Sequence, residues 1–129
     1  MSRSIVLTPG VTTVDLEPSS IPADWIISGE PKSRSRLLAK SHDGTSYVMV
    51  WECSAGRFRW HYVEDETVTV ILGEVFISTA KDDERRLGPG DMAFFPAGSS
   101  AEWRVPDRVR KVAVMRKELG YPLGFGVRA

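Results

Sequence analysis

The sequence predicts an all-β domain folded as an antiparallel sandwich or barrel. Short runs rich in β-branched and aromatic residues recur along the chain, and Gly and Pro residues separate them. No segment of convincing length shows the period of roughly 3.6 residues that marks a helix. The chain has 129 residues, the usual size of one domain. We therefore expect about eight to ten short strands around a single core.

The two ends of the chain differ from its middle. Residues 1–24 contain repeated Pro, Gly and Ser with only short apolar pieces, which is typical of an extended N-terminal arm. Residues 25–118 hold the predicted strands and are expected to form the barrel. Residues 119–129 are rich in Gly and predict an irregular C-terminal tail. An extended arm of this kind is suited to cross to a partner subunit.

Turn signals divide the middle of the chain into strands. The basic stretch 32–40 is interpreted as an edge strand, and Ser54–Gly56 and Pro106–Asp107 are interpreted as turns. The charged run 81–86 is expected at a solvated hairpin tip. In chain order, the predicted strands are 32–40, 47–53, 57–62, 66–72, 75–79, 92–95, 101–105 and 109–116.

Alternation along these strands predicts which side chains enter the barrel. Trp60 and Tyr62 alternate with His61, so the two rings are expected to point inward and the imidazole outward. Glu66 shares the phase of the apolar residues in its strand, which places its carboxyl group inside. Lys111 has the inward phase on the last strand and is therefore the expected partner of Glu66. Burial disfavours the ionised form of a carboxyl group unless a cation or hydrogen-bond donors compensate.

Composition excludes several classes of protein. Lys plus Arg equals Asp plus Glu at 17 each, so no overall positive charge attracts nucleic acid or an anionic membrane. No apolar run reaches the roughly 18 residues of a membrane span. Cys53 is the single cysteine and cannot form an internal disulfide. We interpret the chain as a cytoplasmic protein.

Two turn motifs resemble those of a known superfamily. The segment from Gly90 to Gly98 begins with Gly-Asp and contains Pro96 two residues before its last Gly, which resembles the second cupin motif. Gly56, followed by Glu66 and Gly73, resembles the first cupin motif. The resemblance covers roughly residues 36–116 and implies an antiparallel double-stranded β-helix, the cupin jelly-roll barrel.

Finer features are similar to one branch of the cupins. Trp51-Glu52-Cys53, Ile71-Leu72-Gly73-Glu74 and Phe95-Pro96-Ala97-Gly98 resemble the small single-domain cupins related to (S)-ureidoglycine aminohydrolase. Many members of that branch have no assigned activity. This resemblance therefore implies an architecture and does not name a substrate.

The positions of the metal ligands depart from the cupin pattern. Metal-binding cupins generally carry three His and one Glu, and alignment on the two motifs puts Trp60, Tyr62 and Ala101 at the three His positions. Only Glu66 remains. A transition metal needs several convergent N, O or S donors, so we predict no bound metal and no cofactor.

The residues that would line the barrel predict a small-molecule site. Trp60, Tyr62 and Trp103 are expected to bind a polar metabolite, while Glu66 moves a proton and Lys111 binds an anionic group. Three alternatives stay open at this point. Glu66 and Lys111 form a pair that serves only the fold; Glu66 and an inward-turned His61 hold a metal in a hydrolase or isomerase; or the interior is solid and the chain serves assembly.

Association is a separate expectation. Ile71, Val112 and Val114 have the outward phase, and together they make the outer face of the sheet more apolar than an isolated domain requires. The extended arm also needs a surface to lie on. Both features predict a homodimer.

Overall fold

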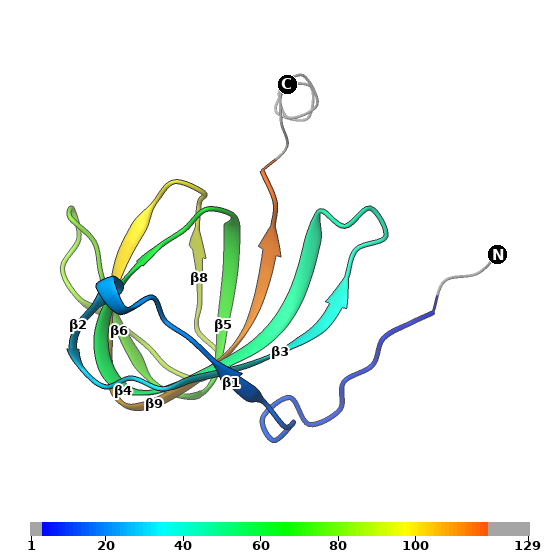
Figure 1. The fold of residues 1–129 in the computed structure, drawn as a ribbon, viewed down its shortest axis with the longest axis horizontal. Coiled ribbons are helices and arrows are strands. Elements are labelled where there is room, and N and C mark those ends of the chain that lie inside the picture. The colour runs from blue at the N-terminus through cyan, green and yellow to red at the C-terminus, as the bar shows by residue number, and fades with distance from the viewer. Residues whose placement is uncertain (1–3, 119–129) are drawn as a thin grey trace.

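A computed structural model describes residues 4–118, which form one curved antiparallel sheet of nine strands (Figure 1). The sheet confirms the predicted all-β class, and within the described residues the single helical element is the one-turn 3₁₀ helix η1. The tail predicted for residues 119–129 lies outside the described residues. The elements are β1 (Glu17–Ser19), η1 (Ala23–Trp25), β2 (Ile26–Gly29), β3 (Ser33–Lys40), β4 (Ser46–His61), β5 (Asp65–Gly73), β6 (Val75–Ser78), β7 (Arg85–Leu87), β8 (Met92–Phe95) and β9 (Ser100–Arg116).

The strand order places β9 at the centre of the sheet. The main path runs β1-β3-β4-β9-β5-β8, with β2 paired to β4, β6 paired to β9, and β7 paired to β6. β4 lies along one side of β9 over nearly its whole length, from Ser46 opposite Arg116 to His61 opposite Ser100. The other side of β9 is shared by β5 and then by β6. The sheet therefore curls around the inner face of β4 and β9.

Two predicted turns are wrong. The chain does not turn at Ser54–Gly56 or at Pro106–Asp107, because β4 and β9 continue through both places. The register between them shifts there instead, between Ser54 and Gly56 on β4. A bulge lets a strand bend without ending its pairing, so Gly and Pro mark bends here rather than ends. Gly56 also gives room to Pro31, whose ring lies 2.7 Å from the place that a Cβ would occupy.

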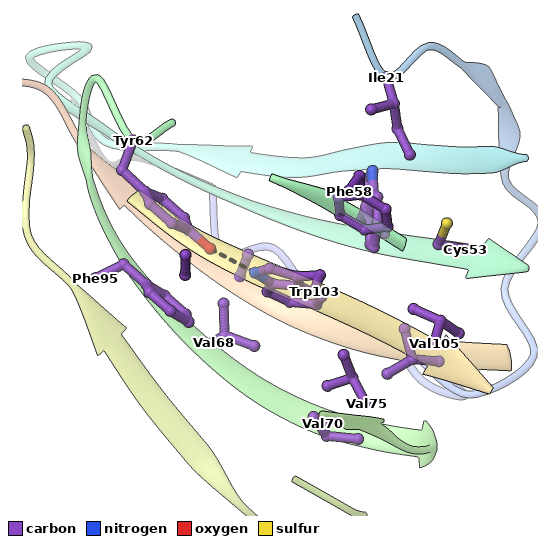
Figure 2. Close-up of a cluster of buried hydrophobic side chains, with 14 of the residues drawn as sticks. Ile21, Cys53, Phe58, Tyr62, Val68, Val70, Val75, Phe95, Trp103 and Val105 are labelled. Atoms are coloured by element: carbon purple, nitrogen blue, oxygen red, sulfur yellow. Dashed lines mark hydrogen bonds between the residues drawn. The ribbon is translucent and has the colours of Figure 1, made fainter. Parts of the chain in front are cut away.

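Aromatic and β-branched side chains fill the inner face of the sheet. Figure 2 shows rings from β4, β8 and β9 side by side with Val68 and Val70 of β5. Phe58 and Trp103 are stacked with ring centroids 6.0 Å apart, and Trp51 meets Trp103 edge-on at 5.9 Å. The deep part of the barrel is therefore a packed core, as the large buried apolar area of these rings favours.

The N-terminal segment is held on the outer face of the sheet by buried polar contacts. Arg110 lies on the outward face of β9, where its guanidinium donates to Glu52 and to the backbone carbonyl oxygens of Val11 and Val14. Arg34 donates in the same way to the Leu16 carbonyl oxygen. Residues 4–10, which precede these contacts, extend away from the body of the sheet (Figure 1).

The outer face carries an apolar stripe, as its alternation predicts. Val48, Val114, Thr67 and Phe94 are opposite one another across β4, β9, β5 and β8. Val114 is 41% exposed and Phe94 is 56% exposed, so these side chains stand on an open face. Between residues 4 and 118, no helix is long and apolar enough to cross a membrane.

Gly73 is the position where the fold depends most on the absence of a side chain. It ends β5 with a φ of 71°, and a Cβ there would lie 1.9 Å from the Arg108 carbonyl oxygen. Gly44, in the turn between β3 and β4, has a similar φ of 75° but open space around it. A substitution at Gly44 therefore adds backbone strain alone, whereas a substitution at Gly73 adds the same strain and a steric clash with β9.

We expect Gly73→Ala to lower the free energy of unfolding by about 2–3 kcal/mol more than Gly44→Ala, because only the first change forces β5 and β9 apart. Gly44→Ala carries the left-handed strain alone, about 1–2 kcal/mol. Urea unfolding followed by tryptophan fluorescence measures both. Equal losses would show that β5 and β9 do not approach as closely as described.

Candidate functional site

The two residues predicted to act together meet inside the barrel. Lys111 Nζ donates to Glu66 Oε2 at 2.6 Å, and the two residues are 7% and 8% exposed. Glu66 is on β5 and Lys111 is on β9, and both point to the inner face as strand alternation predicts. Lys111 Nζ also lies 4.8 Å from the ring centroids of Trp51 and Trp103. The ammonium group is therefore enclosed by one carboxylate and two indole faces.

Tyr62 and Trp103 are used within the core. The Trp103 indole N–H donates to the Tyr62 hydroxyl at 2.9 Å, as the dashed line in Figure 2 marks. The Tyr62 ring stacks on Phe95 with centroids 4.4 Å apart and planes 5° from parallel. Trp103 is almost wholly buried, so its indole cannot meet a ligand without movement of the core. Of these two predicted binding residues, only Tyr62 also borders a cavity.

A pocket of about 220 Å³ opens next to this core. We call it the Glu64 pocket, after a carboxylate in its wall. It includes three of the five predicted site residues, Glu66, Trp60 and Tyr62, and excludes Lys111 and Trp103. The complete lining is Trp25, Tyr47, Met49, Trp60, His61, Tyr62, Val63, Glu64, Glu66 and Met115.

Other hollows lie on the surface away from these residues. One of about 390 Å³ and one of about 310 Å³ adjoin β6 and the loop that follows it. Neither is lined by any of the five predicted site residues. The Glu64 pocket is therefore the cavity in which the inward-facing residues of the first motif meet open space.

Glu64 is the most unusual group in the pocket wall. Its Oε1 accepts a hydrogen bond from the Tyr47 hydroxyl at 2.5 Å. Its Oε2 is shielded from water and has no hydrogen-bond partner among the described residues. A shielded carboxylate oxygen without a partner is costly, because the desolvation of that atom is not compensated. Glu64 lies in the short loop between β4 and β5, directly before the first residue of β5.

The loop that carries Glu64 is fixed by the second motif. The Gly98 amide donates to the Tyr62 carbonyl oxygen at 2.7 Å, and the Tyr62 amide donates to the Ser99 carbonyl oxygen at 2.9 Å. Asp65 accepts from the Ala97 amide at 2.9 Å. The Pro-Ala-Gly turn of the second motif therefore holds both ends of the loop, which keeps Glu64 against the pocket.

Burial changes the acidity of two groups in the pocket wall and of one cysteine elsewhere on β4. It raises the pKa of the Tyr47 hydroxyl well above its usual range, and the hydrogen bond to Glu64 raises it further. It also raises the pKa of Tyr62, with a contribution from the negative charge of Glu66. Burial raises the pKa of the Cys53 thiol to about 12. Both tyrosines therefore remain hydrogen-bond donors, and Cys53 stays a thiol rather than a nucleophilic thiolate.

His61 is placed outward, as its phase predicts. Its side chain is exposed, its Nδ1 shares a 2.7 Å hydrogen bond with the Ser100 hydroxyl, and its ring packs edge-on against Trp25. The inward alternative, in which His61 pairs with Glu66, is wrong because Lys111 occupies that role. His61 contributes only to the rim of the Glu64 pocket.

The donor set does not fit the metal that many cupins hold. Tyr62 and Ala101, at two of the three His positions, are both buried in the core. Glu66, the remaining ligand, is already paired with Lys111. Across residues 4–118, no three His, Cys, Asp or Glu side chains lie together in a way that would hold a metal ion. An ammonium and bulky rings stand where a metal and its imidazoles would be needed.

Sequence reasoning missed Glu64, Tyr47 and Trp25. Glu64 lies between the predicted strands 57–62 and 66–72, and its place two residues before Glu66 is a signal that it lies near the inner face. Tyr47 is the first residue of the predicted strand 47–53, and nothing else in the sequence singles it out. No sequence signal connects Trp25 to the pocket, because η1 reaches it through tertiary packing alone.

A model of the EutQ-like cupin domain matches residues 40–113, which is more than half of the chain. The chain belongs to the EutQ-like cupin family. This finding confirms the cupin resemblance and, with the sheet described above, the jelly-roll architecture. No curated protein matches this EutQ-like cupin.

Three solved structures are similar to this EutQ-like cupin. A protein of unknown function from Pseudomonas syringae pv. tomato, of the DUF861 family, is 25% identical with a TM-score of 0.72, covering 79% of this chain and 44% of that one. This chain therefore spans less than half of that protein. A putative ethanolamine utilization protein Q from Salmonella typhimurium is 26% identical with a TM-score of 0.58, covering 66% and 69%. The Clostridium difficile EutQ protein is 22% identical with a TM-score of 0.65, covering 84% of each chain, and shows the fold alone.

The buried pair predicts a specific pattern of stability changes. We expect Lys111→Met alone to lower the free energy of unfolding by about 3–5 kcal/mol, because it leaves the Glu66 carboxylate buried without a cation. The double variant Glu66→Leu/Lys111→Met removes both charges and should recover most of that loss. Denaturant unfolding of the two single variants and the double variant measures the coupling. A loss below about 1 kcal/mol for Lys111→Met would mean that the pair is open to water.

Proposed function

We propose that this EutQ-like cupin binds a small polar metabolite in the Glu64 pocket without a metal ion. The observation that carries the proposal is the Glu64 pocket itself, which combines aromatic walls with the carboxylate side chains of Glu64 and Glu66. A mostly apolar cavity with a few polar groups is the general form of a small-molecule site. Its volume of about 220 Å³ suits a molecule of metabolite size.

The proposed roles of the site residues follow from their positions. Trp60 and Tyr62 form walls of the pocket, and Glu66 presents its carboxyl group to it from β5. Lys111 acts behind the wall by holding Glu66 in place, and Trp103 supports Tyr62. Lys111 and Trp103 are therefore proposed as positioning residues and not as ligand contacts. This replaces the direct roles that sequence alone assigned to them.

The metal-dependent alternative is weaker on the same evidence. A hydrolase or isomerase similar to ureidoglycine aminohydrolase would need donors beyond Glu66, and the rings at Trp60 and Tyr62 supply none that suit a transition metal. The name of the Salmonella typhimurium relative refers to ethanolamine utilization, but those words describe that protein. We place the chain in the cytoplasm, because its one cysteine is buried as a free thiol.

Blocking the pocket from its rim tests this proposal. Val63 is 78% exposed and lines the Glu64 pocket, so Val63→Trp can narrow the pocket without disturbing the core. Met92 is also exposed and lines the hollow of about 390 Å³ beside β8, which makes Met92→Trp the matched control. We expect at least one probe from a panel of small amines, alcohols, amides and carboxylates to bind the unaltered chain, and Val63→Trp, but not Met92→Trp, to abolish that binding. The readout is the NMR shift of the Trp60 and Trp25 indole N–H groups in the presence of EDTA.

Two results would contradict the proposal. Loss of binding in Met92→Trp and not in Val63→Trp would move the site to the hollow beside β8. Binding that appears only after removal of EDTA and addition of Mn²⁺, Fe²⁺, Ni²⁺ or Zn²⁺ would favour the metal-dependent alternative.

We also propose, as a second role, that the chain assembles as a homodimer through its outer face. The solid core inside the barrel and the apolar stripe on the outside favour this role, because the stripe has no cover within residues 4–118. Ile5 and Leu7, in the part of the arm before its Arg110 contacts, are likewise exposed apolar residues. A second copy would cover both surfaces at once.

We expect light scattering at micromolar concentration to give a dimer mass for the unaltered chain and a monomer mass for Val114→Glu, because a buried charge on the stripe has no partner. Val63→Glu changes an exposed Val of the pocket rim instead and should remain a dimer. A monomer mass for the unaltered chain would refute the assembly role.

A further inference from the structure

The Glu64 pocket is short of one positive charge. Two of its lining residues, Glu64 and Glu66, carry carboxylates, and its lining contains neither Lys nor Arg. Lys111 balances Glu66 from behind the wall at 2.6 Å. Within the part of the chain that the structure describes, no Lys, Arg or His nitrogen lies within 4.0 Å of a Glu64 carboxylate oxygen. One carboxylate charge in the wall is therefore uncompensated.

The hydrogen bonds of Glu64 do not remove this imbalance. Tyr47 donates to Oε1, and a hydroxyl group brings a dipole but no charge. Oε2 receives nothing and is shielded from water. The negative potential of this carboxylate is weakly screened, because no counter-ion lies beside it and one of its oxygens is shielded from water.

Two polar side chains near Glu64, those of His61 and Asp65, have other partners. The His61 Nδ1 is engaged with the Ser100 hydroxyl, and its ring lies against Trp25. Asp65, which follows Glu64, pairs with Arg116 at 3.9 Å and accepts from the Ala97 amide. Neither group supplies the missing positive charge to Glu64.

The aromatic walls of the pocket match a cation as well. Trp25 and Trp60 both line the pocket, with ring centroids 5.0 Å apart and planes 75° from parallel. Rings at this angle form a corner, and at least one indole face is left uncovered by the other. Indole faces attract ammonium groups through their negative quadrupole, and the attraction grows when water is excluded. Lys111 shows the same preference in the core, where it lies over two indole faces.

We propose that the ligand of the Glu64 pocket is a small organic cation, an ammonium group carried on a short chain. This inference rests on the proposed function, since it names the chemical class that the same pocket selects. The ammonium group would lie against the Trp25 and Trp60 corner and balance the Glu64 charge. Met49 and Met115 would contact its carbon atoms.

Pairs of ligands that differ only in charge test the class. Choline is compared with 3,3-dimethyl-1-butanol, its neutral carbon analogue, and propylammonium with 1-propanol. Acetate serves as the anionic probe. We expect each cation to bind the unaltered chain at least about tenfold more tightly than its neutral partner, which is the difference that one uncompensated charge and an indole face supply. Acetate should not bind. The readout is the shift of the Trp25 and Trp60 indole N–H signals.

A change of Glu64 separates charge from shape. Glu64→Gln keeps the size of the side chain and removes its charge, so the affinity ratio between cation and neutral partner should fall to the smaller preference that the indole faces alone supply. Glu30→Gln removes an exposed charge outside the pocket lining and should leave the ratio unchanged. Glu66 is not changed in this test, because its loss would leave Lys111 unpaired in the core.

The outcomes distinguish failure of the cation class from failure of the proposed function on which it rests. If neutral and charged probes bind equally and Val63→Trp abolishes both, the Glu64 pocket is the site and the cation class is wrong. If acetate binds best, the class is also wrong. If no probe of any charge shifts the Trp25 or Trp60 signals, both the class and the pocket fail. An unchanged ratio in Glu64→Gln would place the selecting charge elsewhere.

Discussion

The antiparallel pairing of β4 with β9 is the constraint on which the rest of the structure depends. Because the two strands stay paired through a shared bend, each inward side chain of one strand is set opposite a defined side chain of the other. Trp51 stands opposite Lys111, and Phe58 stands opposite Trp103. β5 pairs with the other side of β9, and this pairing brings Glu66 within hydrogen-bonding distance of Lys111. A shift of one residue would turn every one of these groups outward.

In this register, the interior of the barrel is a packed aromatic core rather than a set of metal ligands. Of the three positions that carry imidazoles in metal-binding cupins, two carry large rings here, Trp60 and Tyr62, and the third carries Ala101. Tyr62 is held by a hydrogen bond from Trp103 and by stacking on Phe95. Rings of this size gain more from burial than they would from lining an open cavity. Lys111 supplies the positive charge that Glu66 needs, so the one surviving acidic residue of the motif is neutralised by the protein itself.

Open space is consequently displaced from the centre of the barrel to its edge. The Glu64 pocket forms where the tightly packed rings end and where η1 brings Trp25 against Trp60. The second cupin motif fixes the loop that carries Glu64 through hydrogen bonds to Tyr62 and Asp65. The two motifs together therefore position the Glu64 carboxylate instead of a metal ion. A change of chemistry within one fold is expected when architecture is set by packing and function is set by a few side chains.

The sequence by itself determined the all-β class, the inward phase of Glu66 and Lys111, and the outward phase of His61, because a period of two residues along a strand settles the face of each side chain. It also carried the two motifs, whose Gly and Pro residues report local backbone geometry. It misplaced two turns, since Gly and Pro mark bends and ends of strands alike. Only the tertiary structure decided that Trp103 lies in the core and that Trp25, Tyr47 and Glu64 share one pocket. Those residues come from separate elements, and their meeting depends on how far the sheet curls, which no local pattern encodes.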